Sequence, residues 1–304
     1  MKRLGNLILI ILTMIVFVTL SCQEADITNN HSIVVTYSIL GSVVKELVGD
    51  NADVTVSIPN GLDPHEWEPS ARSIKAINKA ALVIWNGLGL EEGMKQSLEA
   101  AQKGGVKIFT ASDHIAIRHV GTREGIPSDD PDQAVGAPDP HLWTDPITMK
   151  AIVKALVPIL KKEMDIDVSD RARDLESRLD ALDKEVAGAF SALPSENRKL
   201  VTGHESMGYF SQRYDLRLIG VIVPSLSSQA GVSAANLSAL KNTIVDNHVK
   251  AIFTELGTSP AIAKAISDET GVEVVELGTH SLPEDGSYFT YVKNMADTII
   301  NALR

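Results

Sequence analysis

The sequence predicts an α/β protein of two lobes, each a mainly parallel sheet flanked by helices, joined by one long helix with a cleft between the lobes. Three observations predict this architecture. The chain has 304 residues, more than one domain of ordinary size. Short apolar runs alternate with segments of helical periodicity in both halves of the chain. Between the halves, residues 167–193 carry a sustained and charge-rich helical pattern.

The amino terminus has the pattern of a secretory signal. Two basic residues precede an apolar run, residues 7–20, that is shorter than the roughly 20 residues a membrane span needs. Cys22, the only cysteine, stands at its end, where a bacterial lipoprotein carries its lipid, and residues 23–31 are polar like a tether. We therefore expect residues 1–22 to be a signal peptide and the exported protein to be a membrane-anchored lipoprotein of the periplasm or cell surface. A plain cleaved signal peptide and an uncleaved anchor are the alternatives.

The first lobe is expected over residues 32–165. Its predicted strands are residues 32–38, 53–58, 82–85 and 106–109, and its predicted helices are residues 39–48, 70–81, 91–103 and 146–164. Asp145 suits the N-cap of the last helix, and Pro146 suits its first turn. Residues 111–138 are rich in Asp, Gly and Pro and are expected to form a surface loop.

Residues 166–194 are expected to form the long linking helix, because Leu175, Leu179, Leu182 and Val186 lie on one stripe. An ordinary surface helix of one large domain is the alternative. The second lobe is expected over residues 195–304. Its predicted strands are residues 199–202, 218–223, 251–254 and 272–276, and its predicted helices are residues 206–214, 234–247, 260–270 and 287–303.

Composition limits the possible ligands and partners. The chain is 44% hydrophobic and 22% charged, as in a well-packed globular protein, and its net charge is −11. An acidic surface argues against nucleic acid as a partner and is compatible with gathering cations. Since Cys22 is the only cysteine, disulfides and thiolate metal ligands are excluded, and any metal must be bound by His, Asp and Glu.

A short motif occurs twice. Residues 63–67 read Asp-Pro-His-Glu-Trp, and residues 139–143 read Asp-Pro-His-Leu-Trp. In each, a proline restricts the backbone before the histidine, and the tryptophan can pack the loop against apolar neighbours. A histidine held in place in this way is better suited to bind a metal ion than a mobile histidine is. A third candidate, His204, lies in Val-Thr-Gly-His-Glu, and the pair Glu284 and Asp285 occupies a late loop.

The positions of these residues along the predicted elements suggest one metal site in the cleft between the lobes. His65 and His204 directly follow predicted strands, His141 precedes a helix, and Asp285 lies in the loop after the last strand. Ligands of open α/β sheets collect beyond the carboxyl ends of the strands. Imidazole with carboxylate is the donor set expected for zinc, manganese or a related divalent ion.

Together these motifs resemble the zinc/manganese solute-binding lipoproteins of bacterial ABC transporters, of the zinc-uptake type. The resemblance rests on the two histidine motifs, the run Thr202-Gly-His-Glu-Ser-Met-Gly-Tyr-Phe210 and Asp285-Gly-Ser-Tyr288 before the last helix. It covers essentially the whole mature chain. It implies four metal ligands, which are His65, His141, His204 and Asp285. Glu284 is the rival for the carboxylate, because the aspartate of family members falls on Gly286.

The resemblance favours Zn²⁺ with Mn²⁺ next, since a carboxylate in place of His204 is more typical of manganese binders. The loop before His141 lacks the His-rich tract of many zinc members, which weakens this preference. It offers acidic residues instead, namely Asp113, Asp129, Asp130 and Asp132.

Other polar and aromatic residues have expected roles. Glu255 follows a predicted strand and either bonds a ligand imidazole from behind or contacts solvent. Trp67 and Trp143 are expected to pack. Four further histidines are expected at the surface, namely His114, His119, His248 and His280. Of these, His280 is close in sequence to the last loop and is the one that could join the site.

The expected function is an extracytoplasmic binding protein, not an enzyme, that captures a divalent metal ion as a monomer and delivers it to a membrane permease. A zinc-dependent hydrolase would keep one coordination position open for water. The chain has no His-Glu-x-x-His and no Gly-x-Ser-x-Gly, and its candidate ligands are spread over four loops. A metal-binding adhesin is the other alternative.

Overall fold

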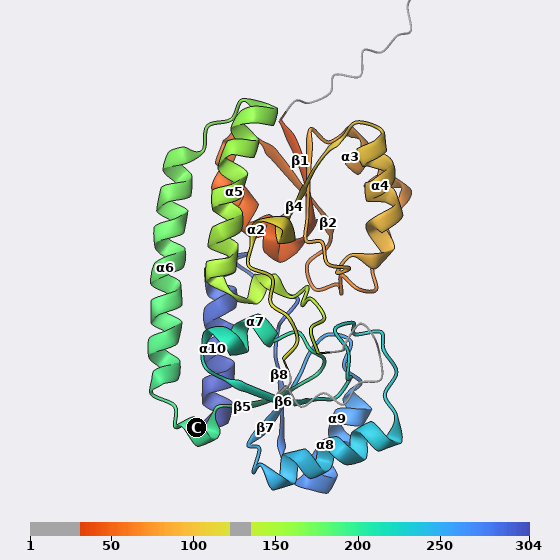
Figure 1. The fold of residues 1–304 in the computed structure, drawn as a ribbon, viewed down its shortest axis with the longest axis vertical. Helices are drawn as coiled ribbons and strands as arrows, with labels where there is room; N and C mark the ends of the chain where they lie inside the picture. Colours follow the sequence, from red (N-terminus) through yellow and green to blue (C-terminus); the bar gives the residue numbers. More distant parts are fainter. Residues whose placement is uncertain (1–30, 122–134) are drawn as a thin grey trace, which may run out of the picture.

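The computed structural model describes residues 31–121 and 135–304 (Figure 1). The expected signal peptide, Cys22 and almost all of the expected tether lie outside the described residues. So do three acidic residues of the loop before His141, namely Asp129, Asp130 and Asp132. Within the described part, no helix is both long and apolar enough to cross a membrane.

The first sheet contains the strands β1 (Ser32–Tyr37), β2 (Asp53–Ile58), β3 (Leu82–Trp85) and β4 (Lys107–Thr110). They are parallel and lie in the order β2-β1-β3-β4, with Val34 opposite both Thr55 and Val83. The central strand β1 is almost wholly buried, since helices cover both faces of the sheet, whereas the edge strand β2 is partly exposed. The covering helices are α2 (Ser38–Val48), α3 (Ala71–Lys79) and α4 (Lys95–Lys103) (Figure 1).

One predicted helix begins later than expected. The pattern over residues 91–103 predicts a single helix, but the structure has a 3-10 turn, Glu92–Met94, before α4. Glu91 is buried, and its carboxylate accepts hydrogen bonds from the Asn86 amide and the Thr36 hydroxyl. With its side chain turned inward, Glu91 has a backbone conformation, φ −96° and ψ 63°, that cannot continue a helix.

The second sheet contains β5 (Lys199–Thr202), β6 (Arg217–Val221), β7 (Ala251–Thr254) and β8 (Glu273–Glu276). These strands are also parallel and lie in the order β6-β5-β7-β8. The helices of this lobe are α7 (Gly208–Arg213), α8 (Ala234–Asp246) and α9 (Pro260–Thr270). The predicted fold class, two α/β lobes with parallel sheets and flanking helices, is confirmed.

Three long helices run beside the lobes (Figure 1). They are α5 (Pro146–Met164), α6 (Ser169–Ser191) and α10 (Tyr288–Leu303). The predicted stripe of α6 is buried, and this helix packs against α2 and α5 of the first lobe and against α10. We propose that residues 32–165 and 195–304 form the two lobes and that residues 166–194 link them.

Candidate metal centre

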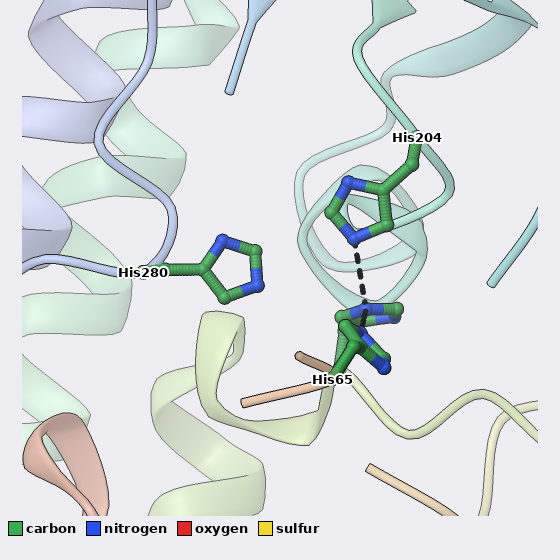
Figure 2. A group of neighbouring side chains, drawn as sticks. His65, His204 and His280 are labelled. Carbon is green, nitrogen blue, oxygen red and sulfur yellow. Dashed lines mark hydrogen bonds between the residues drawn. The ribbon is translucent and has the colours of Figure 1, made fainter. Parts of the chain in front are cut away.

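Four imidazole rings meet between the lobes in the described part of the chain, and they belong to His65, His141, His204 and His280. One ring nitrogen of each lies within 4.8 Å of those of the other three. Nε2 of His141 is 3.3 Å from Nε2 of His65 and 3.2 Å from Nε2 of His204. Nitrogens bound to one tetrahedral zinc ion at about 2.0–2.1 Å stand about 3.3 Å apart. Figure 2 shows the rings of His65, His204 and His280 turned toward one another.

Loops at the ends of secondary structures hold the four rings. His65 follows β2, His204 follows β5 and His280 follows β8, so three of them lie beyond the carboxyl ends of parallel strands. His141 precedes the 3-10 turn Leu142–Thr144, which leads into α5. Each lobe therefore contributes two rings, and their meeting depends on how the lobes are placed.

The repeated Asp-Pro-His motif forms the same local structure twice. Oδ1 of Asp63 accepts a 2.9 Å hydrogen bond from the backbone N–H of His65, and Oδ1 of Asp139 accepts one of the same length from His141. The proline between each pair restricts the backbone and donates no hydrogen bond. Both histidines are thus held by a carboxylate two residues earlier, as the repeat in the sequence indicates.

His141 also has a carboxylate behind its ring. Nδ1 of His141 lies 2.9 Å from Oδ1 of Asp139, whose Oδ2 accepts a 2.9 Å hydrogen bond from Arg118. Burial raises the pKa of Asp139 to about 6, and the Arg118 charge opposes this. Because the carboxylate accepts the proton on Nδ1, the lone pair of Nε2 is left to face the other rings.

The four rings are buried and uncharged. The exposed fractions of His65, His141, His204 and His280 are 3%, 0%, 1% and 4%. Burial lowers the pKa of each ring, that of His280 to about 4. Neutral imidazole is the form that binds a metal ion, so at neutral pH no proton has to leave before binding.

Glu255 lies behind His204, at the end of β7. Its Oε1 accepts a 3.1 Å hydrogen bond from Gly203 N–H, and its Oε2 accepts from the Thr279 hydroxyl at 2.7 Å and from the Ser206 hydroxyl. Oε2 is also 3.5 Å from Nδ1 of His204. Burial raises the pKa of Glu255 to about 7, against the effect of these donors. Of the two positions expected for Glu255, the structure shows the buried one behind the His204 ring, and not contact with solvent.

Asp285 is not brought to the rings. Its carboxylate is exposed and accepts hydrogen bonds from Ser287 N–H at 2.9 Å and from the Thr290 hydroxyl at 2.7 Å. Both partners lie at the start of α10, whose N-cap is Ser287, so this carboxylate holds the loop that enters the helix. Glu284 is exposed as well. The structure thus brings together three of the four ligands implied by the resemblance, and it places neither late carboxylate with them.

The expectation that His280 lies at the surface is wrong. Its ring is 4% exposed, whereas His114, His119 and His248 are exposed as predicted. The sequence contains the signal, since His280 is the candidate that lies soon after the predicted strand 272–276. Asp285 lies further on, directly before a helix, where an acidic residue is more often a cap.

Trp143 joins the His141 loop to the His280 loop. Its ring is fully buried, and its Nε1 donates a 3.0 Å hydrogen bond to the backbone carbonyl of Thr279. Its own carbonyl accepts from the hydroxyl of Tyr288, the first residue of α10. Trp67 is partly buried and packs against the core. The packing role predicted for both tryptophans is confirmed, and Trp143 also ties two of the rings together.

A cleft of about 500 Å³ leads from the surface to His65. Both lobes line it, with Leu88 and Pro138 on one side and Leu226 and Ala230 on the other. The second lobe closes over the His65 motif through two hydrogen bonds, from Ser228 to Asp63 at 2.6 Å and from Gln229 to the His65 carbonyl. The loops around the cleft thus connect the lobes directly over the rings.

Comparisons with known proteins show what this chain is similar to. The family model of the periplasmic zinc-uptake complex component A, ZnuA, matches residues 33–302. The manganese ABC transporter substrate-binding lipoprotein PsaA of Streptococcus anginosus is 27% identical over 320 residues, covering 100% of this chain and 99% of that protein. The periplasmic zinc-binding protein TroA from Treponema pallidum has a TM-score of 0.74 at 26% identity, covering 90% and 98% of the two chains. The laminin-binding adhesin Lmb of Streptococcus agalactiae has the same TM-score at 25% identity, covering 90% and 100%.

Proposed function

Because the chain belongs to the ZnuA family, whose members are substrate-binding components of metal ABC transporters, we propose that it captures zinc outside the cytoplasm and delivers it to a membrane permease. The family consists of binding proteins and not of enzymes, so the prediction that this chain is not an enzyme is confirmed and the hydrolase alternative is not supported. The metal ion is the cargo of the protein.

The proposed ligands are His65, His141, His204 and His280. The observation that carries this proposal is the convergence of four buried ring nitrogens within 4.8 Å of one another. His280 replaces Asp285 in the ligand set, because the Asp285 carboxylate is exposed and bonded to the start of α10. Four nitrogen donors from the protein fill a tetrahedral site and leave no position for water, which suits binding and not hydrolysis.

Zinc is proposed over manganese because of the donor atoms. Names in the family refer to both metals, so family membership does not choose between them. Imidazole nitrogen suits zinc, whereas manganese prefers carboxylate, carbonyl and water oxygen. A tetrahedral site made of four imidazoles therefore supports zinc more strongly than a site that contains a carboxylate would.

Anchoring and delivery are part of the same proposal. Cys22 is proposed to carry a lipid, and residues 23–31 to tether the lobes to the membrane as a monomer. Binding and release would depend on the lobes, since each supplies two of the four ligands. A shift of one lobe against the other would separate the ligand pairs and release the ion to the permease.

Calorimetric titration of metal-free mature protein with Zn²⁺ and with Mn²⁺ tests this function. We expect one Zn²⁺ per chain with high affinity and much weaker binding of Mn²⁺. Equal affinity for the two ions would contradict the zinc preference and leave the family assignment in place. If neither ion binds, or if more than one Zn²⁺ binds per chain with equal affinity, the proposed site is wrong.

A further inference from the structure

A hydrogen-bonded chain of three buried side chains leads from Glu255 to the ring of His280. The hydroxyl Oγ1 of Thr279 lies 2.7 Å from Oε2 of Glu255 and 2.9 Å from Nδ1 of His280. The exposed fractions of Glu255, Thr279 and His280 are 5%, 1% and 4%. Solvent therefore does not compete with these two hydrogen bonds.

The direction of each bond follows from counting protons. All neighbours within hydrogen-bonding distance of the Glu255 carboxylate are donors, namely two backbone N–H groups and the hydroxyls of Ser206 and Thr279. When Glu255 is ionised, its carboxylate only accepts, so the single hydroxyl proton of Thr279 is directed to Glu255. The oxygen of Thr279 is then left as an acceptor, and Nδ1 of His280 must carry the proton between them.

A neutral imidazole has one N–H, so a proton on Nδ1 of His280 leaves Nε2 with a free lone pair. Nε2 of His280 is buried and has no hydrogen-bond partner in the described part of the protein. Figure 2 shows the ring of His280 turned toward His204 and His65. The opposite tautomer would place a proton on Nε2, where it would face the other rings and block a metal ion.

We propose that Thr279 and Glu255 are positioning residues that hold His280 in the one tautomer able to bind a metal ion. The inference rests on the proposed function for its consequence, metal binding, but the tautomer itself is a property of the metal-free protein. It gives Glu255 a role at two rings, since its Oε2 also lies 3.5 Å from Nδ1 of His204.

The position of Thr279 is itself fixed by the surrounding structure. Its backbone carbonyl accepts hydrogen bonds from Nε1 of Trp143 at 3.0 Å and from the hydroxyl of Tyr291 at 2.9 Å. The hydroxyl is thus held between Glu255 and His280 by packing and not by the metal ion. Removing a residue that is hydrogen-bonded to a metal ligand typically lowers metal affinity about 10–100-fold.

The test compares three variants in which one hydroxyl or methyl group changes. Thr279→Val removes the hydroxyl at nearly constant shape, and Thr279→Ser keeps it. Thr36→Val is the matched control, because Thr36 is a buried threonine that donates to a buried glutamate, Glu91, in the other lobe. The loss of zinc affinity in Thr36→Val measures the general effect of replacing a buried, hydrogen-bonded threonine by valine.

Two measurements are made on each protein. Two-bond ¹H–¹⁵N correlation spectra of metal-free protein with ¹⁵N-labelled histidine show which ring nitrogen of His280 carries the proton, with assignment through a His280→Asn variant. Competition with a chromophoric chelator gives the zinc affinity. We expect Nδ1 protonation of His280 in the unaltered protein, in Thr279→Ser and in Thr36→Val. In Thr279→Val we expect a tautomer mixture or Nε2 protonation and a zinc affinity lower by about 10–100-fold.

The outcomes separate this inference from the proposed function. Nε2 protonation of His280 in the unaltered metal-free protein overturns the inference, even if Thr279→Val fails to fold. Unchanged tautomer and affinity in Thr279→Val overturn it as well, and so does an equal loss of affinity in Thr36→Val. If the tautomers are as expected but the unaltered protein binds no zinc, the proposed function fails and the tautomer assignment stands.

Discussion

Nε2 of His141 faces Nε2 of His204 at a distance of 3.2 Å, across the junction between the two lobes. One ring is held from the first lobe by Asp139, and the other is held from the second lobe beside Glu255. Two lone pairs at this distance repel each other unless a proton or a cation lies between them. A divalent ion that binds both nitrogens therefore stabilises the arrangement in which the lobes are close, which couples metal binding to lobe position.

We predict that His280→Ala weakens zinc binding far more than Asp285→Ala. The first change removes one of four proposed ligands, so the loss should exceed the roughly 10–100-fold typical of residues behind the ligands. The second removes an exposed carboxylate that bonds Ser287 N–H and the Thr290 hydroxyl, and it should cause only a small loss of stability with little change in affinity. Chelator competition and denaturant unfolding measure the two effects. The reverse order of affinities would restore Asp285 as the fourth ligand, and His141→Ala should rank with His280→Ala.

Asp139→Asn should reduce zinc affinity by about 10–100-fold, because it replaces the carboxylate that accepts the proton on Nδ1 of His141. Asp63→Asn is the matched control. Asp63 has the same place in the repeated motif and bonds the backbone N–H of His65, but no hydrogen bond joins it to the ring among the contacts described. Asp63→Asn should lose clearly less zinc affinity than Asp139→Asn in the same competition assay. Equal losses would mean that the ring contact of Asp139 adds nothing.

The four buried rings should make a contribution to the stability of the metal-free protein that falls as the pH drops from about 6.5 toward about 4. Burial lowers the pKa of all four rings below the value near 6.5 of an unfolded histidine, that of His280 to about 4. In this range each ring binds more protons in the unfolded than in the folded state, so the rings make the unfolding free energy decrease with decreasing pH. Carboxyl groups whose pKa is raised by burial, such as Asp139 and Glu255, act in the opposite direction. Each ring contributes at most about 1.4 kcal/mol per pH unit.

Urea unfolding at a series of pH values measures this slope. The variant His280→Asn is the control, since it lacks the ring whose pKa is about 4 and should show a shallower dependence. The comparison is made above pH 4.5, and carboxyl groups with raised pKa values, such as Asp139 and Glu255, are present in both proteins, so the difference between the two slopes isolates the contribution of His280. A slope that is the same with and without His280 would show that this ring is not buried in its neutral form.

Zinc should raise the melting temperature of the unaltered protein, and EDTA should reverse the effect. An ion that binds only the folded state stabilises it by about 2.7 kcal/mol when its free concentration is 100 times Kd. Differential scanning calorimetry with buffered free zinc measures the shift. In His280→Ala the shift should be much smaller at the same free zinc. An equal shift in both proteins would show that the stabilising ion binds elsewhere.

Much of this protein follows from local sequence pattern. Residues 53–58 alternate polar and apolar side chains and residues 82–85 are a short apolar run, and these strand patterns depend only on neighbours in the chain. The doubled Asp-Pro-His motif indicates two held histidines, because the aspartate and the proline act within three residues. The start of the predicted helix at residue 91 is different, since Glu91 turns inward and accepts a hydrogen bond from Thr36, which is distant in the sequence.

The sequence by itself determined the two α/β lobes, the long helix between them and three of the rings that meet, because strand ends and the repeated motif mark them. Only the tertiary structure decided the fourth. His280 and Asp285 belong to one loop, and although the place of His280 soon after the strand is a signal, it does not by itself decide which of the two side chains is buried. That choice depends on long-range packing, in which Trp143 and Glu255 bond to Thr279 and turn the neighbouring His280 inward, while Asp285 stays exposed and bonds the Thr290 hydroxyl at the start of α10.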